Sequence, residues 1–240
     1  MVGLAARASY GAKSQAPILM THIAPDAIKF LSELRENNER AWFTANKSRY
    51  EDARHDLAVF VDNLIGEIAA FDPGVIGMEG KDCVFRIYRD TRFAKDKTPY
   101  KTNMGAHIVA GGRKNEMARA GYYLHLEPGG CFLGGGAHHP PSDWMAAIRR
   151  SIERDGDKLR KIAAARDFKK YFGAISGEQI KTAPRGYAKD HPEIDLLRYK
   201  SLVAVHEIKD KDVSDPGFLK HAGKVFKAMK PFEDFLNAAW

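Results

Sequence analysis

The sequence predicts an α+β fold in which an antiparallel sheet of about five strands packs with N-terminal and C-terminal helices. Three observations indicate this class. Helical periodicity dominates residues 25–70, short aromatic or β-branched segments bounded by Gly and Pro fill residues 83–135, and helical periodicity returns after residue 141. Because the short strands follow one another through turns, we expect antiparallel pairing rather than crossover connections.

Two helices are predicted in the N-terminal part. The first begins at Pro25 and runs to Asn37, with apolar residues at Ala27, Ile28, Leu31 and Leu34. A longer helical pattern follows over residues 39–70. The segment Phe71-Asp72-Pro73-Gly74 ends it, because proline and glycine interrupt helices.

The expected strands cover residues 83–88, 104–110, 121–127, 131–135 and 201–208. The turn sequence Pro128-Gly129-Gly130 joins the third and fourth of them as a hairpin. A further helix is predicted from Ser142 to about residue 165, and a closing helix over residues 216–240. Residues 1–21 are expected to form a flexible N-terminal tail, and residues 22–240 a single domain.

Composition points to a cytoplasmic protein with anionic partners. The chain has 240 residues, a formal net charge of +7 and two cysteines, Cys83 and Cys131, outside any CxxC pair. So few thiols are typical of a reducing compartment and exclude a Cys-rich structural zinc site. No apolar run is long enough to span a membrane. Excess positive charge favours phosphates, nucleic acid or another acidic partner.

The densest chemical signal lies between residues 81 and 101, where seven Lys or Arg face three Asp, a local net charge of +4. Arginine presents a planar fork of donors that matches carboxylate or phosphate, and lysine adds a point charge. We expect these side chains to surround one anion, which Asp90 and Tyr100 help to position. The predicted anion-binding residues are Arg86, Arg89, Arg92 and Lys97. The alternative is an ion-pair network that holds a long loop without any ligand.

This segment also carries a recognisable motif. The pattern RxxRDxRFxxxKxxY, present from Arg86 to Tyr100, resembles the signature of a bacterial and fungal family known as domain of unknown function 2461. The resemblance covers about residues 22–240 and includes Asn38-Glu-Arg-Ala-Trp42-Phe43, the Glu127-Pro-Gly-Gly130 turn and the glycines at 134–136. It implies a shared fold and no particular activity.

Strand alternation predicts a polar face on the sheet. Side chains alternate between faces with a period of two. This face would carry Arg86, Tyr88, His107, Tyr123, His125 and Glu127. Of these, His125 and Glu127 are the candidate catalytic residues for proton transfer, because histidine and carboxylate side chains exchange protons near neutral pH. The alternative is the ordinary solvated side of a sheet.

Other signals are weaker. His107, His125, His138 and Glu127 follow no metal-ligand spacing, so neither a metal site nor a cofactor is predicted. Residues 158–200 hold eleven Lys or Arg against five Asp or Glu, with aromatic residues among them. That mixture is compatible with single-stranded nucleic acid, although a solvated basic flank is the alternative and no recognised binding motif is present.

The sequence therefore predicts a protein that recognises a phosphate- or carboxylate-bearing small molecule, either by binding it or by acting on it as an enzyme. Two alternatives remain open at this point: a nucleic-acid-associated binding module, and a non-catalytic scaffold protein with a structural ion-pair loop. The sequence does not determine the oligomeric state.

Overall fold

The structure is a computed structural model that describes residues 19–239 except 113, 114, 116 and 117. Most of the predicted tail, residues 1–21, therefore lies outside the described residues. The last part of that segment contacts the domain, because the carbonyl of Thr21 accepts a hydrogen bond of 2.9 Å from the backbone N–H of Leu219.

The N-terminal helices follow the predicted pattern with one break. Helix α1 spans Pro25–Glu36 and buries Ala27, Phe30, Leu31 and Leu34. The predicted helix over residues 39–70 is divided into α2, Arg40–Ala45, and α3, Lys47–Ala69. The break is at Asn46, whose backbone has φ −108° and ψ 15° and whose side-chain amide donates to Trp42 O at 2.9 Å. Asparagine side chains often compete with helical hydrogen bonds in this way.

The sheet is antiparallel and has four strands in the order β1-β2-β3-β4. Their bounds are Met104–Ile108, Gly121–Leu126, Cys131–Ala137 and Leu202–Ile208. The register places His107 opposite Tyr123, Tyr123 opposite Gly134, and Gly134 opposite Val205. The α+β class and the hairpin between β2 and β3 are confirmed. At the hairpin turn Gly129 has φ +75°, which suits glycine.

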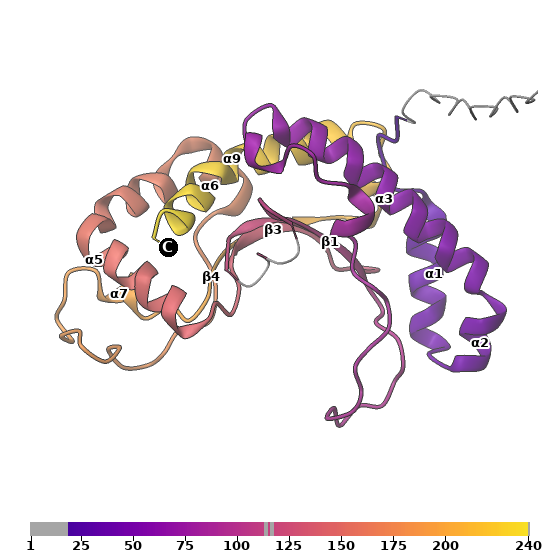
Figure 1. Ribbon diagram of the computed structural model, residues 1–240, viewed down its shortest axis with the longest axis horizontal. Helices are drawn as coiled ribbons and strands as arrows, with labels where there is room; N and C mark the ends of the chain where they lie inside the picture. The colour runs from indigo at the N-terminus through magenta and orange to yellow at the C-terminus, as the bar shows by residue number, and fades with distance from the viewer. Residues whose placement is uncertain (1–18, 113–114, 116–117, 240) are drawn as a thin grey trace, which may run out of the picture.

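The first of the five predicted strands, residues 83–88, is not part of the regular sheet. Cys83 ends the short helix α4, Gly80–Cys83, and the chain then pairs only through isolated bridges, Val84 with Ala106 and Tyr88 with Tyr100. The chain also bends at Ile87. Residues 84–103 therefore form a hairpin arm, which projects from the sheet in Figure 1.

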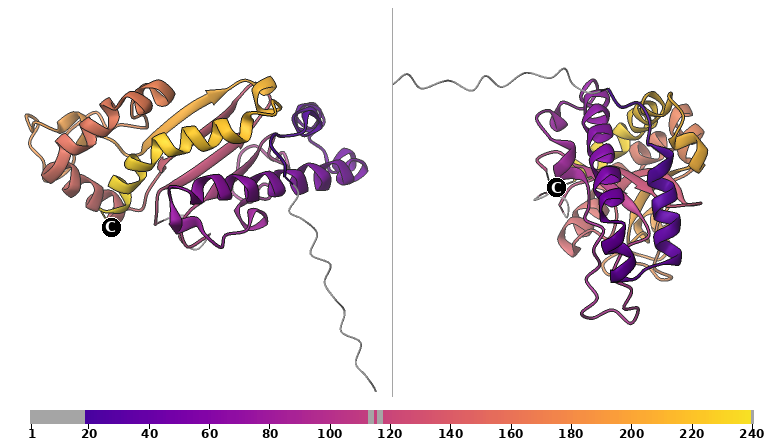
Figure 2. Two further views of the ribbon diagram at one scale, coloured as in Figure 1. Left: turned by 90° about the horizontal axis from the view of Figure 1, so that it is seen from above. Right: turned by 90° about the vertical axis from the view of Figure 1, so that its right-hand side faces the viewer.

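Two long helices cover one face of the sheet. Helix α9, Phe218–Asn237, and α3 lie together above the strands (Figures 1 and 2). The rings of Phe60 and Phe218 stack at 5.3 Å between these helices, and Tyr122 of β2 packs on Phe226 of α9 at 5.2 Å. The apolar core lies between this helical layer and the sheet, so only the opposite sheet face remains open.

The remaining elements flank the sheet. Helix α5 spans Ser142–Ala164, close to the predicted range, and is kinked at Asp155. The other short elements are η1 Pro73–Val75, α6 Arg166–Phe172, α7 Ile194–Leu197 and α8 Asp210–Val213. Within the described part of the chain, no helix combines the length and apolar character needed to cross a membrane.

Candidate functional site on the open face of the sheet

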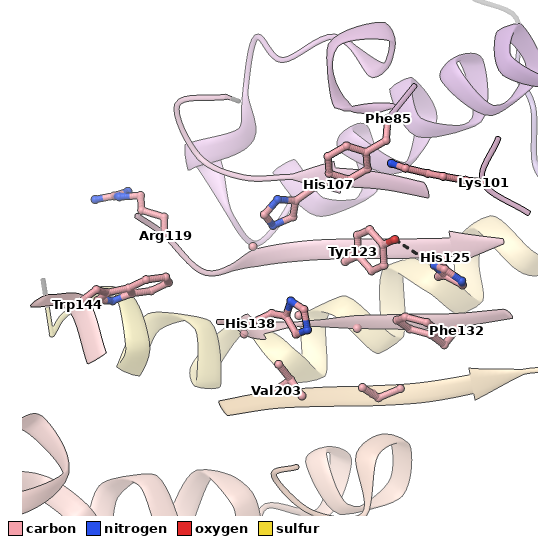
Figure 3. Close-up of a pocket in the computed structure, with 15 residues that line it drawn as sticks. Phe85, Lys101, His107, Arg119, Tyr123, His125, Phe132, His138, Trp144 and Val203 are labelled. Carbon is pink, nitrogen blue, oxygen red and sulfur yellow. Dashed lines mark hydrogen bonds between the residues drawn. The ribbon is translucent and has the colours of Figure 1, made fainter. Parts of the chain in front are cut away.

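The open face of the sheet holds a cavity of about 650 Å³. All four strands and the base of the hairpin arm contribute to its lining (Figure 3). The polar residues in it are Lys101, His107, Arg119, Tyr123, His125 and His138. Pockets of this size are typical of small-molecule sites. The predicted polar face is therefore hollowed rather than flat.

Glycines explain the hollow. Gly121, Gly134 and Gly136 line the cavity floor without side chains. At Gly134 an added Cβ atom would lie 3.4 Å from the ring of Phe132 and 3.2 Å from the carbonyl of Ala204. Gly136 has φ +115°, a conformation that favours glycine. The glycine run of β3 thus lowers the floor between the larger side chains of neighbouring strands.

Aromatic rings form much of the wall. Phe85, Phe132 and Trp144 line the cavity together with Val203 and Val205. The ring of Phe132 stacks on His125 at 4.6 Å with an interplanar angle of 17°. Apolar, largely planar walls suit a ligand that carries a flat or aromatic group.

A connected row of polar groups runs along one side of the cavity. The hydroxyl of Tyr123 lies 3.0 Å from Nδ1 of His125, and Nε2 of His125 lies 3.2 Å from Oε2 of Glu127. Oε1 of Glu127 accepts hydrogen bonds from Arg35 at 3.2 Å and from Thr102 at 3.4 Å. The two predicted catalytic residues are therefore in direct contact, and Tyr123 extends their row into the cavity.

Charge in the cavity comes from two cations. Nζ of Lys101 lies 5.6 Å from the centre of the Phe85 ring, and Arg119 stands at the opposite end of the cavity (Figure 3). Burial lowers the pKa of His107 to about 4, so this ring is neutral at physiological pH. Burial, and then the neighbouring His139, also lower the pKa of His138. Lys101 and Arg119 therefore contribute positive charge to the cavity at neutral pH, whereas His107 does not.

The predicted anion cluster lies elsewhere, on the hairpin arm. Arg89 pairs with Asp96 and donates to the hydroxyl of Thr98, and Arg92 pairs with Asp90 at 2.7 Å. The backbone N–H of Thr98 and then the Arg89 guanidinium hold the pKa of Asp96 at about 2. In the same way, hydrogen bonds from Arg92 lower the pKa of Asp90. Each of these two acids therefore neutralises one arginine.

The other members of the cluster differ in their contacts and exposure. Lys97 donates to the carbonyl of Thr91 at 2.9 Å, Arg86 is exposed, and the side chain of Arg92 is 77% exposed. Tyr100 is buried and stacks on Phe43 with ring centres 3.9 Å apart. This arrangement favours the ion-pair interpretation of the arm over a shared, sheltered anion site.

The predicted alternation over residues 83–88 is wrong. Arg86 and Tyr88 were expected on the polar face, which would put Phe85 on the other face; instead Phe85 lines the cavity, and Arg86 and Tyr88 do not. Tyr88 instead packs near Phe43 and is 44% exposed. The bend at Ile87 interrupts the regular alternation of a strand, which explains the difference.

The basic segment 158–200 does not present its aromatic residues for stacking. Phe168 is buried and packs on Phe232, and Tyr171 packs on His206. Arg160 is held by Glu193 and Asp195. The aromatics of this segment therefore anchor it to the domain.

Metal ligation has no geometric support in the described residues, among which no group of three or more His, Cys, Asp or Glu side chains is placed to hold an ion. Cys131 is buried and its thiol donates to the carbonyl of Glu127 at 3.3 Å. Burial raises the pKa of this thiol to about 11, which disfavours the nucleophilic thiolate.

Several cavity residues were not predicted from the sequence. Lys101 and Arg119 lie outside the regular strands, so alternation does not place them. Phe132 and Gly134 could have been predicted to lie on the cavity face. The predicted turn at Pro128–Gly130 sets the register that pairs Phe132 with His125 and Gly134 with Tyr123. Arg35 comes from α1, and its contact with Glu127 depends on tertiary packing.

A family model described as a conserved hypothetical protein (DUF2461) matches residues 26–235. The chain belongs to the DUF2461 family. The match confirms the resemblance indicated by the motif from Arg86 to Tyr100. No curated protein and no solved structure matches the chain. The DUF2461 region includes the whole sheet, the hairpin arm and every residue that lines the cavity, from Phe85 to Val205.

Proposed function

We propose that this DUF2461 protein binds a small molecule with a phosphate or carboxylate group on the open face of its sheet. The cavity of about 650 Å³ is the observation that carries the proposal. It combines a glycine floor, aromatic walls and a few polar groups, the usual composition of a ligand pocket.

Charge supports an anionic ligand. Lys101 and Arg119 both line the cavity, and the chain as a whole has a net charge of +7. Burial keeps His107 neutral, so this residue offers hydrogen bonds without adding charge. Charge-assisted hydrogen bonds to phosphate or carboxylate are stronger than neutral ones, especially where the site is partly shielded from water.

The hairpin arm contributes to the ligand site through its base only. Its base supplies Phe85 and Lys101 to the cavity, whereas its arginines are engaged with Asp90 and Asp96. The ion pairs thus hold the shape of the arm. We assign anion recognition to Lys101 because it lines the cavity, whereas Arg89 and Arg92 do not line it.

The proposal is tested by calorimetric titration with phenyl phosphate, benzoate and uncharged benzyl alcohol. We expect the two anions to bind more tightly than the alcohol. Lys101→Met and Arg119→Met should each weaken anion binding about tenfold to a hundredfold, because each loses a charge-assisted contact. Lys95→Met, at the exposed tip of the arm, is the matched control and should bind like the wild type.

A second variant probes the cavity itself. Gly134→Val adds side-chain volume to the floor and should abolish binding, while backbone amide spectra show whether the fold is kept. The proposal would be wrong if Gly134→Val bound the anions as tightly as the wild type. It would also be wrong if Lys95→Met lost as much anion affinity as Lys101→Met, because the ligand would then lie outside the cavity.

A second candidate function has one specific observation in its favour. Phe93 is 94% exposed at the tip of the arm, with Arg92 5.9 Å from its ring centre and Lys95 and Lys97 nearby in the sequence. Exposed aromatic and basic side chains together suit single-stranded nucleic acid. This function predicts binding to an oligonucleotide that weakens steeply with salt and is lost in Phe93→Ala. Absence of binding at low salt excludes it.

A further inference from the structure

The row formed by Tyr123, His125 and Glu127 has a defined direction of hydrogen bonding. A carboxylate accepts hydrogen bonds, so Nε2 of His125 carries the proton shared with Glu127 over 3.2 Å. A neutral imidazole then has its lone pair on Nδ1, which accepts the hydroxyl proton of Tyr123 over 3.0 Å. The arrangement therefore prepares His125 to take a proton from Tyr123.

The far end of the row is held in place. Glu127 receives Arg35 and Thr102 on the oxygen that does not face His125, and Arg35 also donates to the carbonyl of Pro128 at 3.1 Å. A carboxylate oriented in this way fixes the tautomer of the imidazole and stabilises the imidazolium once it forms.

The near end of the row reaches the cavity. Tyr123 and Lys101 both line the cavity, and the Tyr123 hydroxyl is directed toward His125 (Figure 3). Gly105 makes space for this hydroxyl, because a Cβ atom there would lie 2.7 Å from the Tyr123 oxygen. A molecule bound in the cavity could therefore contact both the Tyr123 oxygen and a cation that lines the same cavity.

We propose that the cavity is an active site in which Tyr123 moves a proton to and from a carbon next to a carbonyl group. The substrate class is a carbonyl compound that carries a carboxylate or phosphate and a flat apolar group. This inference rests on the proposed ligand site and adds a reaction to it. The apolar group fits against Phe85 and Phe132, and the anionic group faces Lys101 or Arg119.

The step is a balanced proton transfer. The C–H proton passes to the Tyr123 oxygen as the hydroxyl proton of Tyr123 passes to Nδ1 of His125. The electron pair of the C–H bond becomes the carbon–carbon double bond of an enolate, and the carbonyl π electrons move onto oxygen. The imidazolium of His125 is balanced by Glu127, and the reverse sequence returns a proton to carbon.

The charges of the cavity favour this direction of transfer. Negative charge develops on the substrate oxygen, and the positive side chains that line the cavity stabilise it more effectively there than in water. Tyr123 is the catalytic residue because it touches the reacting atoms. His125 receives its proton, whereas Glu127 and Arg35 act as positioning residues.

The test follows the loss of C–H protons in D₂O by NMR, with phenylpyruvate as the carboxylate probe and dihydroxyacetone phosphate as the phosphate probe. The wild type should accelerate exchange of at least one probe well above the buffer rate. Tyr123→Phe should lower that rate a hundredfold or more with the dissociation constant nearly unchanged. Tyr88→Phe, outside the cavity, is the matched control and should keep the wild-type rate.

The positioning role has its own readout. Glu127→Gln should slow exchange at least tenfold and change the ¹⁵N shifts of His125, because the preferred tautomer is lost, while the probe still binds. A purely structural role of Glu127 would leave the tautomer unchanged.

Each remaining outcome overturns one part of the proposal. A probe that binds without accelerated exchange overturns the reaction but not the ligand site. Exchange that persists in Tyr123→Phe overturns the assignment of Tyr123. Failure of both probes to bind overturns the substrate class, while the titrations with phenyl phosphate and benzoate judge the ligand site independently.

Discussion

The carboxyl group of Glu233 lies directly against the backbone of Gly135, where an added Cβ atom would be only 2.4 Å from Oε1. Glu233 is 2% exposed, and within the described residues neither of its carboxyl oxygens has a hydrogen-bond partner. Burial raises its pKa well above the usual range. The nearby backbone of Gly136 favours the charged carboxylate of Glu233 and so opposes this rise in pKa. The contact between them does not have the geometry of a hydrogen bond. The glycine strand of the cavity thus covers a buried acid on its helical side.

Replacement of Gly135 should destabilise the fold. In Gly135→Ala the new methyl group meets Glu233 and the sulfur of Met229 at 2.4 Å, and the carbonyl of Gly121 at 2.6 Å. Overpacking of this kind costs about 1–3 kcal/mol in the free energy of unfolding, measured by urea denaturation. Gly66→Ala on α3, where nothing lies within 4 Å, is the control and should be stabilising. Equal stabilities of the two variants would contradict this account.

The raised pKa of Glu233 predicts a pH dependence of stability. Its pKa in the folded state lies above the unfolded value, so folding takes up a proton at pH values between the two. The stability that protonated Glu233 contributes is fully present below its unfolded pKa of about 4.3. It is lost as the pH rises toward the pKa of Glu233 in the folded state. Between pH 5 and 8, the free energy of unfolding should therefore fall more steeply in the wild type than in Glu233→Gln, by up to about 1.4 kcal/mol per pH unit. If the free energy of unfolding changed with pH equally in the wild type and in Glu233→Gln, Glu233 would not be the group responsible.

Asn38 is expected to fix the hairpin arm to the N-terminal helices. Its side-chain amide donates to Tyr100 O at 3.0 Å and accepts from Tyr100 N at 3.1 Å. Loss of both bonds in Asn38→Ala should cost about 1–3 kcal/mol and accelerate amide exchange at Tyr100. Asn37→Ala is the control: the Asn37 side-chain amide donates to the carbonyl of Glu33, and its loss should leave that exchange rate unchanged.

The ion pairs of the arm should contribute little to global stability. Arg89 and Asp96 form a surface pair, and such pairs are weak and screened by salt. Arg89→Ala should leave the urea midpoint and the binding of phenyl phosphate nearly unchanged, while the arm becomes more sensitive to limited proteolysis. A large loss of phenyl phosphate affinity in this variant would restore the arm as the anion site.

Cys131 should react slowly with alkylating reagents. Its thiol is buried and has a pKa of about 11. At pH 8 the native protein should therefore be alkylated by iodoacetamide at Cys131 roughly a hundredfold more slowly than the urea-unfolded chain, followed by peptide mass spectrometry. Similar rates in the native and unfolded states would show that the thiol is accessible.

Local pattern was sufficient for most of the fold. The stripe of α1, the turn at Pro128–Gly130 and the alternation of β2 depend on neighbours a few residues apart, so the sequence predicts them directly. The contact between His125 and Glu127 follows from the same alternation, since residues two apart share a sheet face. The break at Asn46 and the bend at Ile87 interrupt longer patterns and were not predicted.

By itself, the sequence determined the α+β class, the order of the long helices and of the four sheet strands, and the polar side chains of β2. Only the tertiary structure decided that Arg89 and Arg92 pair with acids of their own arm while Lys101 and Arg119 line the cavity. The physical reason is that secondary structure follows from short-range periodicity, whereas the partner of a charge depends on which distant segments meet. A count of charges along the chain does not contain that information.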